Sequence, residues 1–149
     1  MKKDTRNFLK LAACAGLATL ALSALAHSPA ALDTMKTPNG GQVRDAGSLH
    51  LELVVVKTSK TASDNPVFVY VTERALQKVS TAGAVATVTL MSGTDKVSAA
   101  LQPDGDNRLK GVARYASTPD LKAIVSVTLA GKPPEQTRFT PLAPIARTH

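Results

Sequence analysis

The residues best suited to chemistry in this chain are its three histidines, His27, His50 and His149. His50 and Glu52 stand two residues apart within the segment 49–56, where apolar side chains alternate with other residues. In a β-strand this spacing places the imidazole and the carboxylate on the same face. Such a pair can help to hold a divalent metal ion, or it can simply form the polar outer face of a sheet.

His27 becomes a stronger metal ligand if the chain is cleaved after Ala26. The new terminal amine and the imidazole of the same residue can then chelate Cu(II) together, since imidazole is a favoured copper ligand. We therefore predict that His27, His50 and Glu52 bind Cu(II) or another divalent metal. The alternative is that cleavage leaves an arbitrary first residue and that no metal is bound.

Residues 1–26 have the three-part pattern of a cleavable signal peptide. Four basic residues within the first ten precede an uncharged apolar run over 11–26, and Ala24 and Ala26 occupy the small-residue positions before the cut. The apolar run is shorter than the roughly 20 residues that a membrane span needs. We therefore expect export to the periplasm, with no stable membrane insertion after cleavage.

The same segment partly matches two other export routes. The sequence that ends at Cys14 resembles a lipobox, which would make a lipoprotein, although it begins the apolar run instead of ending it. Residues 5–10 resemble a twin-arginine motif in which Thr5 replaces the first arginine. Because Cys14 is the only cysteine, we expect the mature protein to have no disulfide.

Sequence motifs for catalysis and for nucleic-acid binding are not found. The chain has no Gly-x-Ser-x-Gly, His-Glu-x-x-His or phosphate-binding motif. Its basic residues are dispersed and only 3% of its residues are aromatic, whereas binding of single-stranded nucleic acid needs stacking platforms along a basic groove. We therefore predict a protein that is not an enzyme and does not bind nucleic acid.

Short apolar runs separated by turn residues predict an all-β fold. The expected strands cover 49–56, 67–71, 84–91, 96–101, 108–114, 121–129 and 136–139, with turns at 38–41, 64–66 and 103–107. The best match is an antiparallel immunoglobulin-like β-sandwich of about seven strands, and the alternative is a small β-barrel. The core is predicted to contain Leu51, Leu53, Val69, Val88, Leu101, Val125 and Val127.

Four segments follow from these patterns. They are the signal peptide at 1–26, an irregular N-terminal arm at 27–40, the β-sandwich domain at 41–140 and a flexible tail at 141–149. The net charge of +7 lies partly in the signal peptide, so we expect the mature domain to be only mildly basic.

Several segments of the mature chain have a familiar arrangement of glycines and apolar residues, namely 38–43, 45–47, 50–54, 83–84, 88–90 and 109–111. Together they resemble small periplasmic proteins of proteobacteria and the N-terminal domain of heavy-metal efflux adaptor proteins. The resemblance implies a β-rich fold, a role in metal handling and an envelope efflux or metal-handling protein as partner. It carries over His50 and Glu52 as site residues, whereas Asn39 stands where the metal-associated proteins often have histidine.

These observations predict a non-enzymatic accessory or binding domain of the periplasm, linked to copper or heavy-metal handling. The alternative is a structural or protein-interaction module of the cell envelope with no metal role. The competing enzyme class is a small hydrolase, and a deep pocket with convergent polar groups that unites His50 with a serine and an acid would favour it. A flat apolar patch or an exposed edge strand would favour an interaction module.

Overall fold

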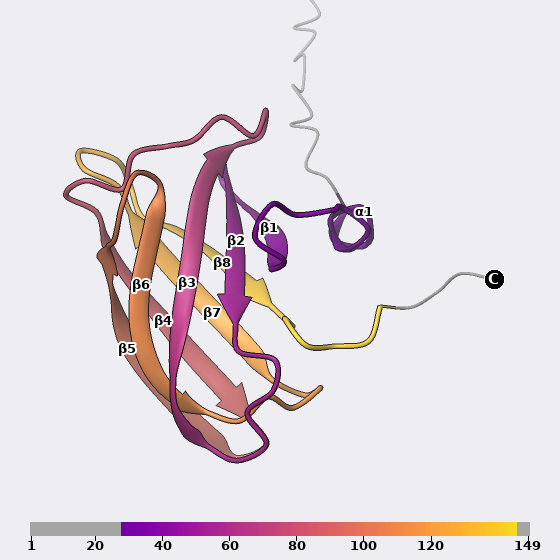
Figure 1. Cartoon of the computed structure of the whole chain (residues 1–149). Coiled ribbons are helices and arrows are strands. Elements are labelled where there is room, and N and C mark those ends of the chain that lie inside the picture. Colours follow the sequence, from indigo (N-terminus) through magenta and orange to yellow (C-terminus); the bar gives the residue numbers. More distant parts are fainter. Residues whose placement is uncertain (1–27, 146–149) are drawn as a thin grey trace, which may run out of the picture.

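The computed structural model describes residues 28–145, which form an antiparallel β domain with one short helix (Figure 1). The elements are α1 (Pro29–Asp33), β1 (Gln42–Ala46), β2 (Leu49–Val55), β3 (Ser63–Glu73), β4 (Val85–Ser92), β5 (Asp95–Pro103), β6 (Arg108–Tyr115), β7 (Lys122–Thr128) and β8 (Glu135–Phe139). The predicted signal peptide and His27 lie outside the described residues. No helix within residues 28–145 is long and apolar enough to cross a membrane.

All eight strands belong to one sheet, in the order β1-β2-β3-β6-β5-β4-β7-β8. The sheet bends sharply at β5 and β6, whose ladder contains only the pairs Gln102–Lys110 and Pro103–Leu109. Its two end strands, β1 and β8, return to lie beside each other, so that the sheet is nearly closed and barrel-like (Figure 1). The expected immunoglobulin-like sandwich of two separate sheets is not confirmed, because β5 and β6 pair directly where a sandwich would leave a gap.

The hydrophobic core lies inside this barrel, where alternate side chains of each strand point. In β2, Leu49, Leu51, Leu53 and Val55 are all buried in the core. The seven residues predicted to form the core are each at most 1% exposed: Leu51, Leu53, Val69, Val88, Leu101, Val125 and Val127. The all-β fold and its core are therefore as the period-two spacing predicted.

The segment 64–66 is part of β3 and not the predicted turn. Asn65 Nδ2 donates hydrogen bonds to the carbonyl oxygen of Tyr115 at 2.8 Å and to Ser59 Oγ at 2.9 Å. The carbonyl oxygen of Pro66 accepts a hydrogen bond from the Tyr115 hydroxyl at 2.8 Å. These long-range bonds hold an Asp-Asn-Pro sequence in a strand although its local preference is for a turn.

The arm that was expected to be irregular contains α1. Ser28 Oγ accepts a hydrogen bond from the N–H of Ala31 at 3.3 Å, and Pro29 occupies the first turn. Both features are typical of a helix N-terminus. Leu32 is buried, so this short helix packs against the barrel beside β1.

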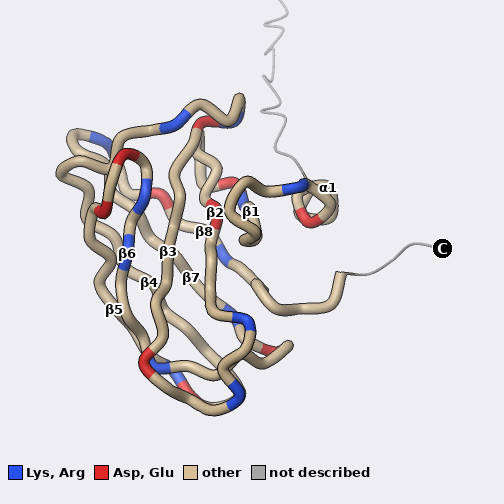
Figure 2. The backbone as a smooth tube through the Cα atoms, viewed as in Figure 1, with Lys and Arg blue, Asp and Glu red and all other residues tan. Residues whose placement is uncertain are grey.

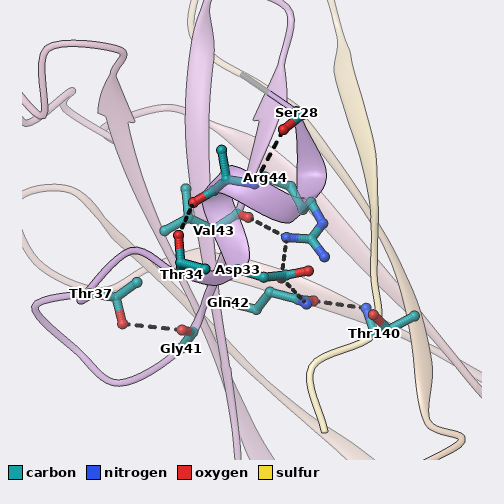
Figure 3. A network of polar contacts seen from close by, with 10 residues as sticks. Ser28, Asp33, Thr34, Thr37, Gly41, Gln42, Val43, Arg44 and Thr140 are labelled. Carbon is teal, nitrogen blue, oxygen red and sulfur yellow. Dashed lines mark hydrogen bonds and ion pairs between the residues drawn. The ribbon is translucent and has the colours of Figure 1, made fainter. Parts of the chain in front are cut away.

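Side chains join β1 to the chain after β8 at the seam of the barrel (Figure 3). Gln42 Oε1 accepts a hydrogen bond from the N–H of Thr140 at 2.8 Å, and Gln42 Nε2 donates to Asp33 Oδ1 at 2.9 Å. Arg44 Nη1 donates to the same Asp33 oxygen at 2.7 Å and to the carbonyl oxygen of Val43 at 2.8 Å. This seam network, made of Asp33, Gln42, Arg44 and Thr140, ties α1, β1 and the C-terminal segment together.

The seam network predicts a loss of stability in acid. The hydrogen bond from Arg44 holds the pKa of Asp33 below its ordinary value of 3.8. A carboxylate with a lowered folded-state pKa stabilises the fold above its ordinary pKa, and this contribution is lost as the pH falls through the lowered value. Near neutral pH we expect Asp33→Asn to lower the free energy of unfolding by up to about 1 kcal/mol, because the pair is partly exposed.

Urea unfolding at several pH values, followed by circular dichroism, measures this effect. The difference in the free energy of unfolding between wild type and Asp33→Asn should decrease as the pH falls below about 4. Asp95→Asn, an exposed position at the β4–β5 turn, is the matched control. If this difference in free energy stays constant from neutral to acid pH, the ionised Asp33 carboxylate does not stabilise the fold.

Candidate functional site

His50 and Glu52 lie where the sequence predicted, on one face of β2 that points away from the barrel core. They line a hollow of about 220 Å³ over the outer face of β1, β2 and β3. Both side chains are nevertheless buried, with His50 2% and Glu52 6% exposed. The turn at 38–41 and the segment after β3 cover them, so these two polar residues of the outer face are shielded from solvent.

The Glu52 carboxylate holds the turn at 38–41 in place. Glu52 Oε1 accepts hydrogen bonds from the N–H groups of Asn39 at 3.1 Å and Gly41 at 2.9 Å, and Oε2 accepts one from Asn39 Nδ2 at 2.9 Å. A Cβ on Gly41 would overlap the carbonyl oxygen of Leu53, so only glycine allows the turn to approach β2 this closely. Glu52 therefore has a structural role that three donors satisfy.

The His50 imidazole is held between neighbouring strands. His50 Nε2 lies 2.7 Å from Asp45 Oδ1, and the two residues are opposite each other in the β1–β2 ladder. On its other side His50 is opposite Thr72 of β3. The imidazole therefore has a carboxylate on one neighbouring strand and a hydroxyl-bearing residue on the other.

The segment 74–78, which follows β3, covers part of this hollow. It turns back on itself through a hydrogen bond from the N–H of Glu73 to the carbonyl oxygen of Gln77 at 2.8 Å. Leu76 stands in this turn with a φ of 62°, a backbone conformation that leucine seldom adopts. Its side chain and that of Lys78 complete the wall of the hollow.

The predicted metal ligands do not form a metal site by themselves. Within residues 28–145 there is no group of three or more His, Cys, Asp or Glu side chains that could hold a metal ion. His50 and Glu52 share a face, but the carboxylate of Glu52 already accepts three hydrogen bonds. His27 lies outside the described residues, so metal binding by His27, His50 and Glu52 stays a prediction.

The hollow also bears on the enzyme alternative. A hydrolase would require His50 to share a pocket with a nucleophilic serine and an acid. The described residues that line the hollow include no serine, and its hydroxyls belong to Tyr70 and Thr72.

A larger cavity, of about 450 Å³, lies at one end of the barrel. Here β2 begins, β3 ends, β7 ends and β8 begins, at the end where the β3 arrowhead stands in Figure 1. Its apolar walls come from Leu49, Val79, Val127, Leu129 and Pro133. We call it the mouth cavity.

Charged residues surround the opening of the mouth cavity. Glu73 ends β3, Arg74 follows it, Lys132 lies in the β7–β8 loop and Glu135 begins β8. Figure 2 shows both acidic and basic positions at this end of the barrel. Arg74 Nη2 donates a hydrogen bond to the carbonyl oxygen of Gly47 at 3.0 Å. With two acidic and two basic side chains, the rim has no net charge.

Sequence reasoning missed the mouth cavity. Its lining residues come from four strands and three connecting segments, and each appears in the sequence as an ordinary strand or turn residue. Only the closure of the sheet brings Leu49 close to Val127, since β2 and β7 are far apart in the strand order.

Comparisons with known proteins give no match for this chain: no protein-family model, no curated protein and no solved structure matches it. The resemblance to the N-terminal domain of heavy-metal efflux adaptor proteins therefore stays a prediction.

Proposed function

We propose that this protein is a non-enzymatic binding domain of the periplasm and that the mouth cavity is its ligand site. The observation that carries the proposal is a cavity of about 450 Å³ with apolar walls at the mouth of a barrel. Ligand sites for small molecules span roughly 300–1,000 Å³ and often occupy the mouths of β-barrels. The resemblance to envelope proteins and the predicted signal peptide support the periplasmic location.

The walls and rim of the cavity indicate the class of ligand. Five apolar residues form the walls, so burying an apolar molecule there is favoured by the hydrophobic effect. The rim charges are balanced in number, so the ligand needs no net charge. The proposed ligand is a small, mostly apolar, uncharged molecule.

A protein-interaction module is less well supported. The exposed large apolar side chains among the described residues are Leu76, Val85, Val112 and Ile145. They come from the loop after β3, from β4, from β6 and from the C-terminal segment, and single exposed apolar residues are normal on a protein surface. A role in copper or heavy-metal handling would depend on metal binding by His27 and on an envelope partner. Among residues 28–145 there is no group of three or more His, Cys, Asp or Glu side chains that could hold a metal ion.

Binding of the apolar fluorophore N-phenyl-1-naphthylamine tests the proposal. We expect wild type to bind one fluorophore saturably, with a rise in its emission. Val79→Trp fills the cavity from the loop side and should weaken binding by about tenfold or more, which corresponds to about 1.4 kcal/mol. Val112→Trp places the same ring on the exposed face of β6, away from the cavity, and should bind as wild type does.

Leu129→Trp fills the same cavity from the β7–β8 side and serves as a second blocking variant if Val79→Trp disturbs the loop after β3. Circular dichroism checks that each variant keeps the β fold. Equal binding by wild type and both blocking variants would exclude the mouth cavity as the site. Absence of binding in wild type would favour the alternative, a protein-interaction module of the cell envelope.

A further inference from the structure

A third cavity, also of about 220 Å³, lies beside the seam, where β7 begins and β8 ends. Its apolar lining, which we call the floor, includes Met91, Ile124 and the mostly buried Phe139, and it is also lined by Arg44, Lys122 and Arg138. We call it the seam pocket. It is at the opposite end of β7 and β8 from the mouth cavity, so it is a separate site.

The charges of the seam pocket all have the same sign. Arg44 comes from β1, Lys122 from β7 and Arg138 from β8, and no aspartate or glutamate is among the described residues that line the pocket. The ion pairs of the described residues include neither Lys122 nor Arg138. Arg44 is paired with the Asp33 carboxylate, so the uncompensated positive charge of the pocket comes from Lys122 and Arg138. Two cations from adjacent strands create a positive potential that attracts an anion.

Arg44 provides a buried donor group at this pocket. The residue is 9% exposed, and its described hydrogen bonds all come from Nη1, which reaches Asp33 and the carbonyl oxygen of Val43. An arginine carries five N–H donors, and buried donors are nearly always paired. Asp33 and the carbonyl oxygen of Val43 both bind Nη1 (Figure 3), and the guanidinium has further N–H donors besides this nitrogen.

The strand register places the two exposed cations around the apolar floor. Arg138 is opposite Ile124 in the β7–β8 ladder, and Lys122 is opposite Met91 in the β4–β7 ladder. Met91 also lines the pocket, and its other cross-strand neighbour is Lys96. Lys122, Ile124 and Arg138 therefore share one face of the sheet. An anionic group can meet the two cations there while an attached apolar group packs on Ile124 and Met91.

We propose that the seam pocket binds a small organic anion, in which a carboxylate or phosphate group is attached to a compact apolar body. Guanidinium groups and lysine side chains both bind these anions, and charge-assisted hydrogen bonds are stronger than neutral ones. The volume suits a molecule of one ring, and it is below the range of larger ligand sites. This inference is independent of the proposal for the mouth cavity, because the two sites share no residue.

Titration of the purified protein, followed by amide chemical shifts, tests the seam pocket. The probes are benzoate, phenyl phosphate and inorganic phosphate, with benzylamine as a cation of similar shape. Benzoate and phenyl phosphate should shift the amides of Ile124 and Phe139, and the ratio of their affinities distinguishes the two anion classes. Inorganic phosphate should bind about tenfold more weakly, because it lacks the apolar body.

Variants of the exposed cations provide the second arm of the test. Lys122→Gln and Arg138→Gln should each weaken benzoate binding by about tenfold, since each removes a hydrogen bond between charged groups. Lys110→Gln, an exposed lysine on β6 on another side of the barrel, should bind as wild type does. The proposal is overturned if benzoate and phenyl phosphate leave the amide resonances of Ile124 and Phe139 unshifted, or if benzylamine binds as tightly as benzoate does. It is also overturned if the three variants bind benzoate with the same affinity.

Discussion

Adding one methyl group at Gly111 is expected to destabilise the barrel by about 3 kcal/mol. A Cβ at this position would lie 2.5 Å from the carbonyl oxygen of Ala100 and 2.7 Å from Cδ2 of Leu101. Neither neighbour can move away easily, because one is backbone and the other is a core side chain that is 1% exposed. Gly111 stands next to the short β5–β6 ladder, where glycine permits the close approach of strands that a tight bend in a barrel needs.

Urea unfolding of Gly111→Ala and wild type measures this loss. Gly93→Asn, in the turn between β4 and β5, is a suitable control, because a Cβ there would meet no atom within 4 Å. Asparagine accepts the positive φ of 56° at Gly93, so this variant should stay within about 1 kcal/mol of wild type. If Gly111→Ala is as stable as Gly93→Asn, the close packing of β5 against β6 does not determine the bend.

The strands and the core were predictable because each depends on local alternation. Residues such as Leu51 and Val125 follow a period of two, and burial of that face is the main favourable term in folding. The closure of the sheet was not predictable in this way. It depends on contacts between distant segments, such as Gly111 with Ala100 and Gln42 with Thr140, and no local pattern marks these pairs.

The same contrast applies to the candidate sites. The shared face of His50 and Glu52 followed from their spacing and is confirmed in β2. The cover over that face was not predicted, because it depends on the turn that binds Glu52 and on the unusual backbone of Leu76. The turn predicted at 64–66 was wrong for a related reason, since the bonds of Asn65 outweigh its local preference.

Glu52→Ala should lower the free energy of unfolding by about 3 kcal/mol, near the upper end of the effect of a charged hydrogen-bonding group. The side chain is 6% exposed and accepts three hydrogen bonds from the turn at 38–41. Without it the N–H groups of Asn39 and Gly41 lose their acceptor in a partly buried position. The hold of the turn on β2 should then weaken, leaving the bond from Lys57 Nζ to the carbonyl oxygen of Gly40 and the pairing of Gln42 with Leu53.

Glu52→Gln should lower the free energy of unfolding less than Glu52→Ala does, because the amide retains one oxygen that accepts hydrogen bonds. Some loss should remain, since its NH2 group faces another donor. Glu73→Gln, an exposed glutamate at the end of β3, should change stability by no more than about 0.5 kcal/mol and is the matched control. Titration of the same variants with Cu(II) separates a structural role from metal ligation. If Glu52→Ala is as stable as wild type but binds Cu(II) more weakly, Glu52 is a metal ligand and the structural role that we assign to it is wrong.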